Sequence, residues 1–444
     1  MQKIFRSVMW CALVMGAAGS VFGTPAALAQ SSVDQFQVPL EYIKNMKSRP
    51  ASSAVMSHAG STKRGPSTFA RTASVPGIDS LANWTGQFTA PGFDPNDNPQ
   101  STWSFAMVGG APEAGGTTTI NAPIIPVTVR LLDQNGHVAR TKNGTRLILR
   151  SSGPLASAVV NSPIFQPFSY TSGVGQYNDQ MQRAEFWDRI HHGEDGGGSN
   201  WHTVLSPDVK TGRTMDIPFG SYFYGLHADG SIAYFLVEGT AFTNVLFPPT
   251  FPVDNTTVIG AAELAGDMTT HDLTTLLFNN VYLYDKTPDQ CCVLGFHEYD
   301  FEPGVPSNGN LPRLYVMNYS SWVSPGLFVN GSADVTTLSH EVSETFNDPF
   351  VNNVVPWWSS VDPFSGFAQC QDVLEVGDVV EVLTALPLYQ VAMNGRTYHV
   401  QNEAMFPWFA DESPSPAHLA AYSFPDEDTL LSLSPGPLHP GCKP

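Results

Sequence analysis

The sequence carries little charge for its length and has no cluster of basic residues. Only 14% of its 444 residues are charged, against roughly 25% in ordinary soluble domains. Asp and Glu (40) outnumber Lys and Arg (21), and the formal net charge is −19. Because nucleic acids and anionic membrane surfaces attract basic clusters, this composition excludes both as expected partners.

The sequence also lacks an apolar run of about 18 residues, the length that a membrane-spanning helix needs. The first 29 residues instead have the pattern of a secretory signal peptide, with Lys3 and Arg6, an apolar segment and then Ala27-Leu28-Ala29. We therefore expect a secreted protein, extracellular or periplasmic, with no membrane insertion after signal cleavage. The polar segment 30–78 is expected to form a flexible leader or pro-segment.

Cysteine is scarce, and the absence of any C-x-x-C spacing argues against a cysteine-rich zinc site. Beyond the expected signal peptide the chain has Cys291, Cys292, Cys370 and Cys442. An even number of cysteines in an exported protein favours disulfides over free thiols. Of the three pairings that are possible, we favour Cys370–Cys442 together with the adjacent pair Cys291–Cys292.

Glycine (38 residues) and proline (36 residues) are plentiful, which is typical of loop-rich and strand-rich extracellular proteins. We expect an α+β fold in which a strand-rich N-terminal region, residues 79–260, packs on a zincin-like C-terminal region, residues 261–444, that carries the active-site helix. The segments that predict this class are strands at 121–132, 145–150, 221–224 and 231–237, a helix at 180–190, and a helix or loop running into a strand at 273–284.

The most informative motif is the HExxE sequence of His340–Glu344, one residue away from the His-Glu-x-x-His signature of zinc peptidases. In a helix, His340 and Glu344 lie on the same face, four residues apart. Asp334 or Ser332 is expected to cap the start of this helix, and Asp348-Pro349 to end it. The opposite face is an apolar stripe expected to pack on the core, formed by Val335, Leu338, Val342 and Phe346.

A catalytic zinc site has three protein ligands and one open position. His340 and Glu344 are two candidate ligands, and Glu375 is the third. Asp378 is either a further ligand or an acceptor that orients His340. Glu341 is the expected general base. Zinc is the first choice of metal, while the additional carboxylate also admits calcium or manganese. The alternative is an ordinary His–Glu contact on a surface helix, with exposed acids elsewhere.

Three other features of the sequence are candidate parts of a metal or catalytic site. The His-rich segment 191–202 is a second metal candidate, but its glycine tract favours a solvated flexible loop. His297 and Glu298 fall in an expected strand, where they point to opposite faces, so we interpret them as structural or at most as lining a groove. Tyr398 and His399 are candidate oxyanion helpers or replacement ligands.

The order of several motifs resembles that of a known group of proteins. It runs from Leu294–His297 through the HExxE motif to Asn347–Phe350, Trp357-Trp358, Glu375–Asp378 and Asn394–Arg396. This order resembles secreted microbial HExxE…E-x-G-D metallopeptidase-like proteins, and it is distantly similar to the plant phosphate-induced (Exordium-like) proteins. The resemblance is clearest over residues 275–410. It implies a metallopeptidase-like helix and a secreted location.

The sequence therefore predicts a secreted zinc-metallopeptidase-like hydrolase that acts on a peptide or cell-wall-associated substrate. The alternative is a non-catalytic extracellular or cell-wall-associated protein, in which the same residues bind a structural ion. A glycan-binding or glycan-cleaving module is a third hypothesis, because the chain has 9 Trp and 14 Tyr. No carboxylate pair for glycan cleavage can be placed from the sequence.

Overall fold

The computed structural model describes residues 33–46, 78–91, 100–191, 200–248, 253–358, 371–381 and 386–433. The expected signal peptide, most of the His-rich segment (192–199), Cys370 and Cys442 lie outside the described residues. With 39% strand and 24% helix in mixed sheets, the structure confirms the α+β class.

Seven of the described strands form a central sheet around the long strand β4 (Thr117–Leu131). β8 (His202–Val209) pairs in parallel with the first half of β4, and β9 (Arg213–Ile217) pairs in parallel with its second half. β4 also pairs in parallel with β12 (Leu273–Asn279) and antiparallel with β5 (Ile148–Arg150). The predicted strands around residues 121–132 and 145–150 are thus confirmed.

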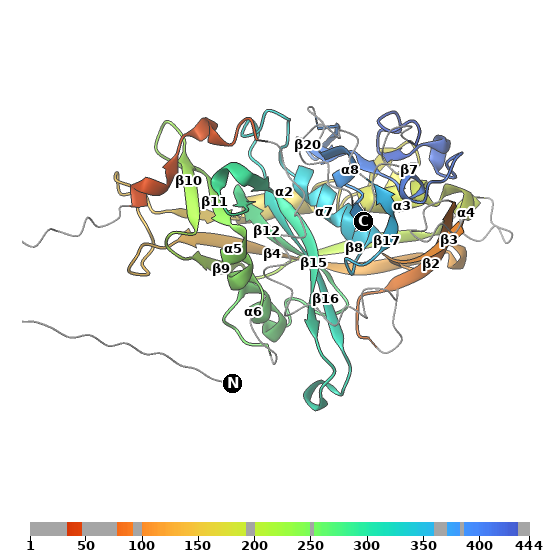
Figure 1. The fold of residues 1–444 in the computed structure, drawn as a ribbon, viewed down its shortest axis with the longest axis horizontal. Coiled ribbons are helices and arrows are strands. Elements are labelled where there is room, and N and C mark those ends of the chain that lie inside the picture. The colour runs from red at the N-terminus through yellow and green to blue at the C-terminus, as the bar shows by residue number, and fades with distance from the viewer. Residues whose placement is uncertain are drawn as a thin grey trace, which may run out of the picture.

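The sheet continues from β12 to β16 (Arg313–Trp322) and ends, among the described strands, at β15 (Gly295–Glu302). β15 and β16 form a long antiparallel hairpin that projects from the body of the molecule (Figure 1). In this register His297 lies opposite Asn318. Buried side chains from both strands of the hairpin contribute to the cores, among them Phe296, Val316 and Met317.

Two hydrophobic cores lie on opposite faces of this sheet. Side chains alternate between the faces of a strand, so Leu277 of β12 belongs to one core and its neighbour Leu276 to the other. The helices of the first core include α3 (Tyr177–Glu185) and α7 (Thr336–Asn347), and those of the second include α5 (Gly239–Leu246) and α6 (Val258–Ala265).

The expectation of a flexible leader is wrong for residues 33–46. Their apolar side chains pack on a second sheet, where β1 (Gln37–Val38) pairs in parallel with β10 (Tyr222–Leu226) and Ile43 is fully buried. Residues 47–77 lie outside the described ranges. The other strands of the second sheet are β11 (Ile232–Glu238), β13 (Val281–Tyr284) and β14 (Cys291–Val293).

Residues 273–284 form two strands in different sheets, so the predicted helix or loop before a strand is wrong. Asn280 joins them with φ at 51°, a left-handed conformation that Asn tolerates better than most residues. Its side-chain amide nitrogen donates to Ser324 Oγ, and its side-chain carbonyl oxygen accepts the Ser324 backbone N–H, each at 2.8 Å. This fixed bend carries the chain from one sheet to the other.

The boundary expected at 260/261 falls inside one packed unit. β4 and β8 from the N-terminal side share the central sheet with β12, β15 and β16 from the C-terminal side. The smaller elements are the ribbons β2 (Asn83–Pro91) with β3 (Gln100–Val108), β6 (Phe168–Tyr170) with β7 (Gly173–Gly175), β17 (Val354–Trp358) with β18 (Gln371–Val373), β19 (Leu388–Met393) with β20 (Arg396–Gln401) and β21 (Glu403–Ala404) with β22 (Ser423–Phe424), and the helices α2 (Gly153–Val160), α4 (Trp187–His191), α8 (Asp378–Glu381) and α9 (Phe406–Phe409).

Cys291 and Cys292 form a disulfide, as expected for the adjacent pair. The other favoured pair, Cys370–Cys442, lies outside the described residues. Within the described ranges, no helix combines the length and the apolar character that crossing a membrane would require.

Candidate metal centre

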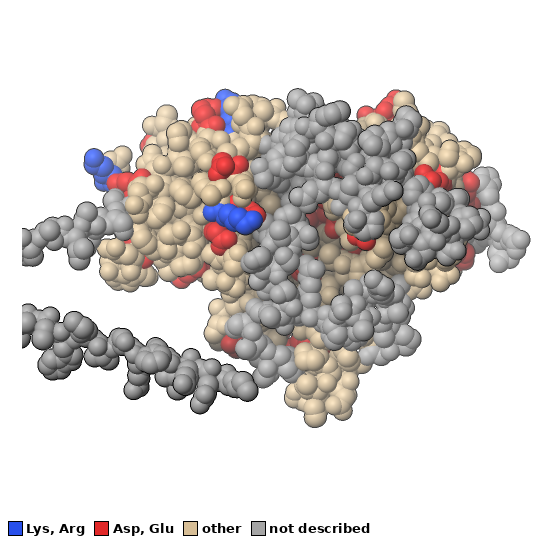
Figure 2. Space-filling model, in the orientation of Figure 1, with Lys and Arg blue, Asp and Glu red and all other residues tan. Residues whose placement is uncertain are grey.

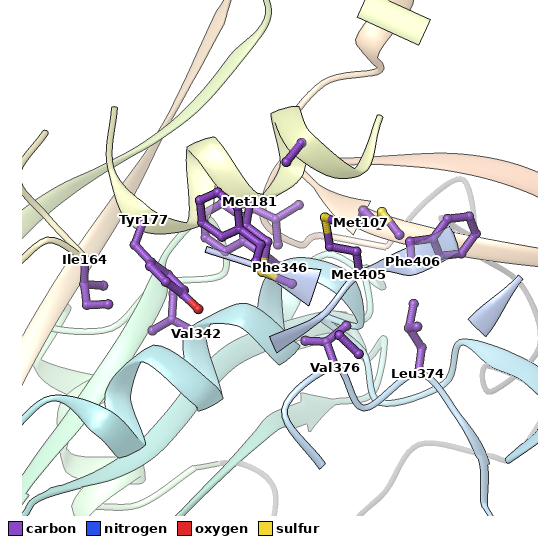
Figure 3. Packing of buried hydrophobic residues seen from close by; sticks show 14 of the residues in the cluster. Met107, Ile164, Tyr177, Met181, Val342, Phe346, Leu374, Val376, Met405 and Phe406 are labelled. Carbon is purple, nitrogen blue, oxygen red and sulfur yellow. The ribbon is translucent and has the colours of Figure 1, made fainter. Parts of the chain in front are cut away.

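α7 carries the HExxE motif through the middle of the first core. All of its residues are buried, and the predicted apolar stripe is confirmed, with Val342 and Phe346 in the same cluster as Tyr177 and Met181 of α3 (Figure 3). The opposite face is enclosed as well. The small hydroxyl side chains of this helix, those of Ser339, Ser343 and Thr345, donate to backbone carbonyl oxygens three or four residues earlier, so these three donors are paired although they are buried.

The ends of α7 are fixed by loops, and the predicted cap is wrong. The N-cap residue is Val335, without a side-chain cap bond, while Asp334 Oδ1 accepts the backbone N–H groups of Val335 and His399. At the other end the carboxylate of Asp348 accepts the backbone N–H of Asn353 at 3.1 Å. The helix therefore stops at Asn347, as the sequence predicted.

His297 approaches α7 from β15. The predicted strand is confirmed, and its alternation turns Gly295 and His297 towards α7 while Phe296 joins the opposite core. A Cβ atom at Gly295 would lie 2.5 Å from Glu341 Oε1, so only glycine permits this close approach. His297 Nδ1 then lies 3.3 Å from Glu344 Oε2. From the sequence, His297 is expected to be structural or at most to line a groove, so its place among the candidate ligands was not predicted.

The acidic segment after β18 is pressed onto the other side of α7. Val376 is buried in the first core, and the Gly377 N–H donates to Glu344 Oε1 at 3.2 Å. A Cβ atom at Gly377 would lie 2.4 Å from His340 Nδ1. The absence of a side chain at this position therefore lets Glu375, two residues before it, and Asp378, directly after it, reach the motif.

Among the described residues, two groups could hold a metal ion: His297 with Glu344 and Glu375, and His340 with Glu344 and Asp378. Within each group the ligand atoms lie within 4.8 Å of one another. The four predicted ligands all lie in this cluster. The structure pairs Glu375 with His297, at 3.8 Å, and Asp378 with His340, at 3.7 Å.

Glu341, the expected general base, lies beside the His297 group. Its Oε2 atom is 4.0 Å from His297 Nδ1, and its side chain is 5% exposed. Within the described part of the chain this oxygen has no hydrogen-bond partner. An unpaired buried carboxylate oxygen costs free energy, so its position calls for a partner such as a cation or a water molecule.

The cluster brings several carboxylates together in a buried space, and this shifts the pKa values of its residues. Burial raises the pKa values of Glu341, Glu375 and Asp378 well above the ordinary values. Burial alone would lower the pKa of His297, but the carboxylates of Glu375 and Glu344 outweigh it and raise that pKa to about 9. A metal ion would therefore have to displace protons from this chain.

The other residues that the sequence suggested for the site form contacts outside the cluster. The Tyr398 hydroxyl donates to the carbonyl oxygen of Ala158, and His399 Nδ1 lies 2.7 Å from Asp334 Oδ2. Neither residue belongs to the two candidate metal groups. In the His-rich segment, His202 Nδ1 contacts the carboxylate of Asp179 at 3.0 Å.

Comparisons of the chain with protein-family models, with curated proteins and with solved structures found no match. The chemistry of the site is therefore argued from its own residues. One imidazole nitrogen and two carboxylate oxygens in each group form a donor set that divalent zinc or manganese accepts.

Proposed function

We propose that the chain is a metal-dependent hydrolase in which His297, Glu344 and Glu375 bind the catalytic ion and Glu341 is the general base. The observation that carries this proposal is the position of Glu341, a buried carboxylate with an unpaired oxygen 4.0 Å from a candidate ligand. Glu341 is the base predicted from the sequence, whereas His297 takes the place of the predicted His340 as the histidine ligand of this ion.

The residues around the site have distinct tasks in this proposal. A zinc ion, when bound, would polarise a substrate carbonyl and lower the pKa of a water molecule. Glu341 would accept the proton of that water and deliver it to the leaving group. The Gly377 N–H, donating to Glu344 Oε1, would hold that carboxylate in place.

Zinc is the proposed metal because each group offers an imidazole together with few oxygen ligands. Manganese is an alternative for the same donors. Calcium is a weaker alternative, since it takes six to eight oxygen ligands.

The proposed substrate is a peptide or a cell-wall-associated amide outside the cell. The signal-peptide pattern of residues 1–29 supports an extracellular or periplasmic location. The face of the molecule drawn in Figure 2 carries many acidic side chains and few basic ones. Such a surface repels polyanions, which supports leaving nucleic acid out of the proposed partners.

One observation favours a second candidate function, a structural ion in a non-catalytic extracellular protein. The side chains of the cluster are 4–14% exposed, which is little for a site that must admit a substrate. In this alternative the ion would only join β15, α7 and the segment 374–378.

Glu341→Gln separates the two functions, because it removes the base and keeps the ligands. We expect the zinc-loaded wild-type protein to cleave members of a peptide library, and we expect chelators to stop it. Glu341→Gln should lower the rate by a factor of about 100 or more with unchanged zinc content. The matched control is Glu113→Gln, at an exposed carboxylate, which should keep full activity. Full activity of Glu341→Gln would refute the base, and a zinc-loaded wild type without activity would favour the structural ion.

A further inference from the structure

The two oxygens of Glu344 face different histidines. Oε1 lies 3.1 Å from His340 Nε2, and Oε2 lies 3.3 Å from His297 Nδ1. Glu344 is the residue that the two candidate groups share, and each group has its own histidine and its own second carboxylate. A carboxylate placed in this way has one oxygen available for each of two ions.

We propose that the cluster binds two divalent ions, bridged by Glu344. One ion would be held by His297 and Glu375, and the other by His340 and Asp378. Two-metal hydrolytic sites place their ions about 3.5–4 Å apart, a spacing that a bridging carboxylate allows. This inference rests on the proposed function for the first ion and adds a second site to it.

The cluster has enough carboxylates to balance the charge of two divalent ions. Glu341, Glu344, Glu375 and Asp378 are buried together, and their ion pairs among the described residues are with His297 and His340. Histidines bind metals in the neutral form, and a carboxylate that binds a metal ion must first lose its proton. Two divalent ions would therefore balance these four carboxylates once the ions have displaced their protons.

Two independent features of the structure point to bound cations. Glu341 Oε2 is buried, has no hydrogen-bond partner within the described residues and lies 4.0 Å from His297 Nδ1. On the His340 side, the Gln371 amide donates to Asp378 Oδ2 at 3.4 Å, which leaves Oδ1 facing His340. Such an outer hydrogen bond is what orients a carboxylate ligand.

The two sites differ in their surroundings. Glu375 is the most exposed of the six cluster side chains, at 14%, and Glu341 lies beside its group. His340 and Asp378 are 8% and 7% exposed. Because Glu375 is the most exposed ligand and Glu341 lies beside it, the ion at His297 would be the one that a substrate reaches, while the ion at His340 would hold Glu344 in position.

Manganese binding to the full chain tests the proposal. Chelator-treated protein is titrated with Mn²⁺, and bound ions are counted by equilibrium dialysis and followed by electron paramagnetic resonance. We expect two ions in the wild type, with a spectrum broadened by coupling between neighbouring ions. Glu375→Gln and Asp378→Asn should each retain one ion and show the uncoupled spectrum. Glu113→Gln, at an exposed carboxylate, should retain two.

The outcomes separate this proposal from the proposed function. One ion per wild-type chain with an uncoupled spectrum would overturn the second site and leave the proposed hydrolase intact. No bound ion would overturn both. Circular dichroism checks the fold of each variant, and if one fails to fold, the wild-type count and spectrum still decide the question.

Discussion

At the scale of single residues, two glycines set the distance between α7 and the segments that complete the site. Because Gly295 has no side chain, Glu341 can lie directly against β15. Because Gly377 has none, His340 can lie directly against the acidic segment 374–378. Neither position has a positive φ, so the requirement is for space and not for an unusual backbone conformation. Substitution at these positions therefore tests the geometry of the site without changing a ligand.

Gly377→Ala should weaken metal binding. The added Cβ atom would lie 2.4 Å from His340 Nδ1, so the imidazole or the segment carrying Glu375 must move. We expect the zinc affinity to fall by a factor of about 10–100, the range seen when groups that support metal ligands are altered. Competition with a chromophoric chelator measures the affinity.

Gly153→Ala is the matched control, because a Cβ atom there meets open space at the start of α2. Its zinc affinity should equal that of the wild type. Wild-type affinity in Gly377→Ala as well would show that His340 is not a ligand in the proposed arrangement.

At the scale of elements, Asn353 ties the loop after α7 to β3. Its Oδ1 accepts the Ala106 N–H at 2.9 Å, and its amide donates to the Ala106 carbonyl oxygen at 2.7 Å. The amide also donates to the carbonyl oxygen of Asn347, the last residue of α7. A single buried side chain therefore holds the end of the motif helix against a strand more than 200 residues away.

Asn353→Ala should lower the free energy of unfolding by about 2–3 kcal/mol, because it leaves buried backbone groups without partners. Urea denaturation measures this change. The control Asn135→Ala lies in an exposed turn and should change the free energy by less than about 0.5 kcal/mol. Equal stability of the two variants would contradict the anchoring role.

The elements that could be predicted from the sequence are those whose local pattern is unambiguous. β4 and α7 follow from strand composition and helical spacing. Residues 273–284 could not be assigned, because a short buried apolar run fits a helix as well as a strand. Asn280 was the local signal for the break, since Asn tolerates a positive φ.

The candidate site was predicted in part. The helical spacing of the HExxE motif and the acidic segment after it identified His340, Glu344, Glu375 and Asp378. His297 was missed, because no local pattern says which strand packs on which helix. The signal in the sequence was Gly295, two residues before it, since a glycine on the same face of a strand marks a close approach.

At the scale of the whole molecule, the cluster joins three parts of the chain that are distant in sequence. β15 provides His297, α7 provides the HExxE motif, and the segment before α8 provides Glu375. An ion bound by all three favours the folded state, in which alone these residues meet. Metal binding and stability should therefore be coupled.

Zinc at about 100 times its dissociation constant should raise the free energy of unfolding by about 2.7 kcal/mol. The effect should grow as pH rises from 6 towards 9. His297, whose pKa is raised to about 9, must lose a proton before it can bind zinc, so protons compete less with zinc at higher pH. Urea denaturation with zinc and with chelator at several pH values measures both effects. Equal stability with and without zinc at pH 8 would contradict the coupling.

His297, Glu344 and Glu375 are proposed to bind a divalent ion, and anomalous X-ray diffraction at the zinc absorption edge can locate that ion. With crystals of the protein supplied with zinc, we expect an anomalous peak within about 2.0–2.2 Å of His297 Nδ1 and of a carboxylate oxygen of Glu344. Crystals grown with zinc that show no peak at this cluster, or a peak only elsewhere on the chain, would show that these residues do not form the metal site.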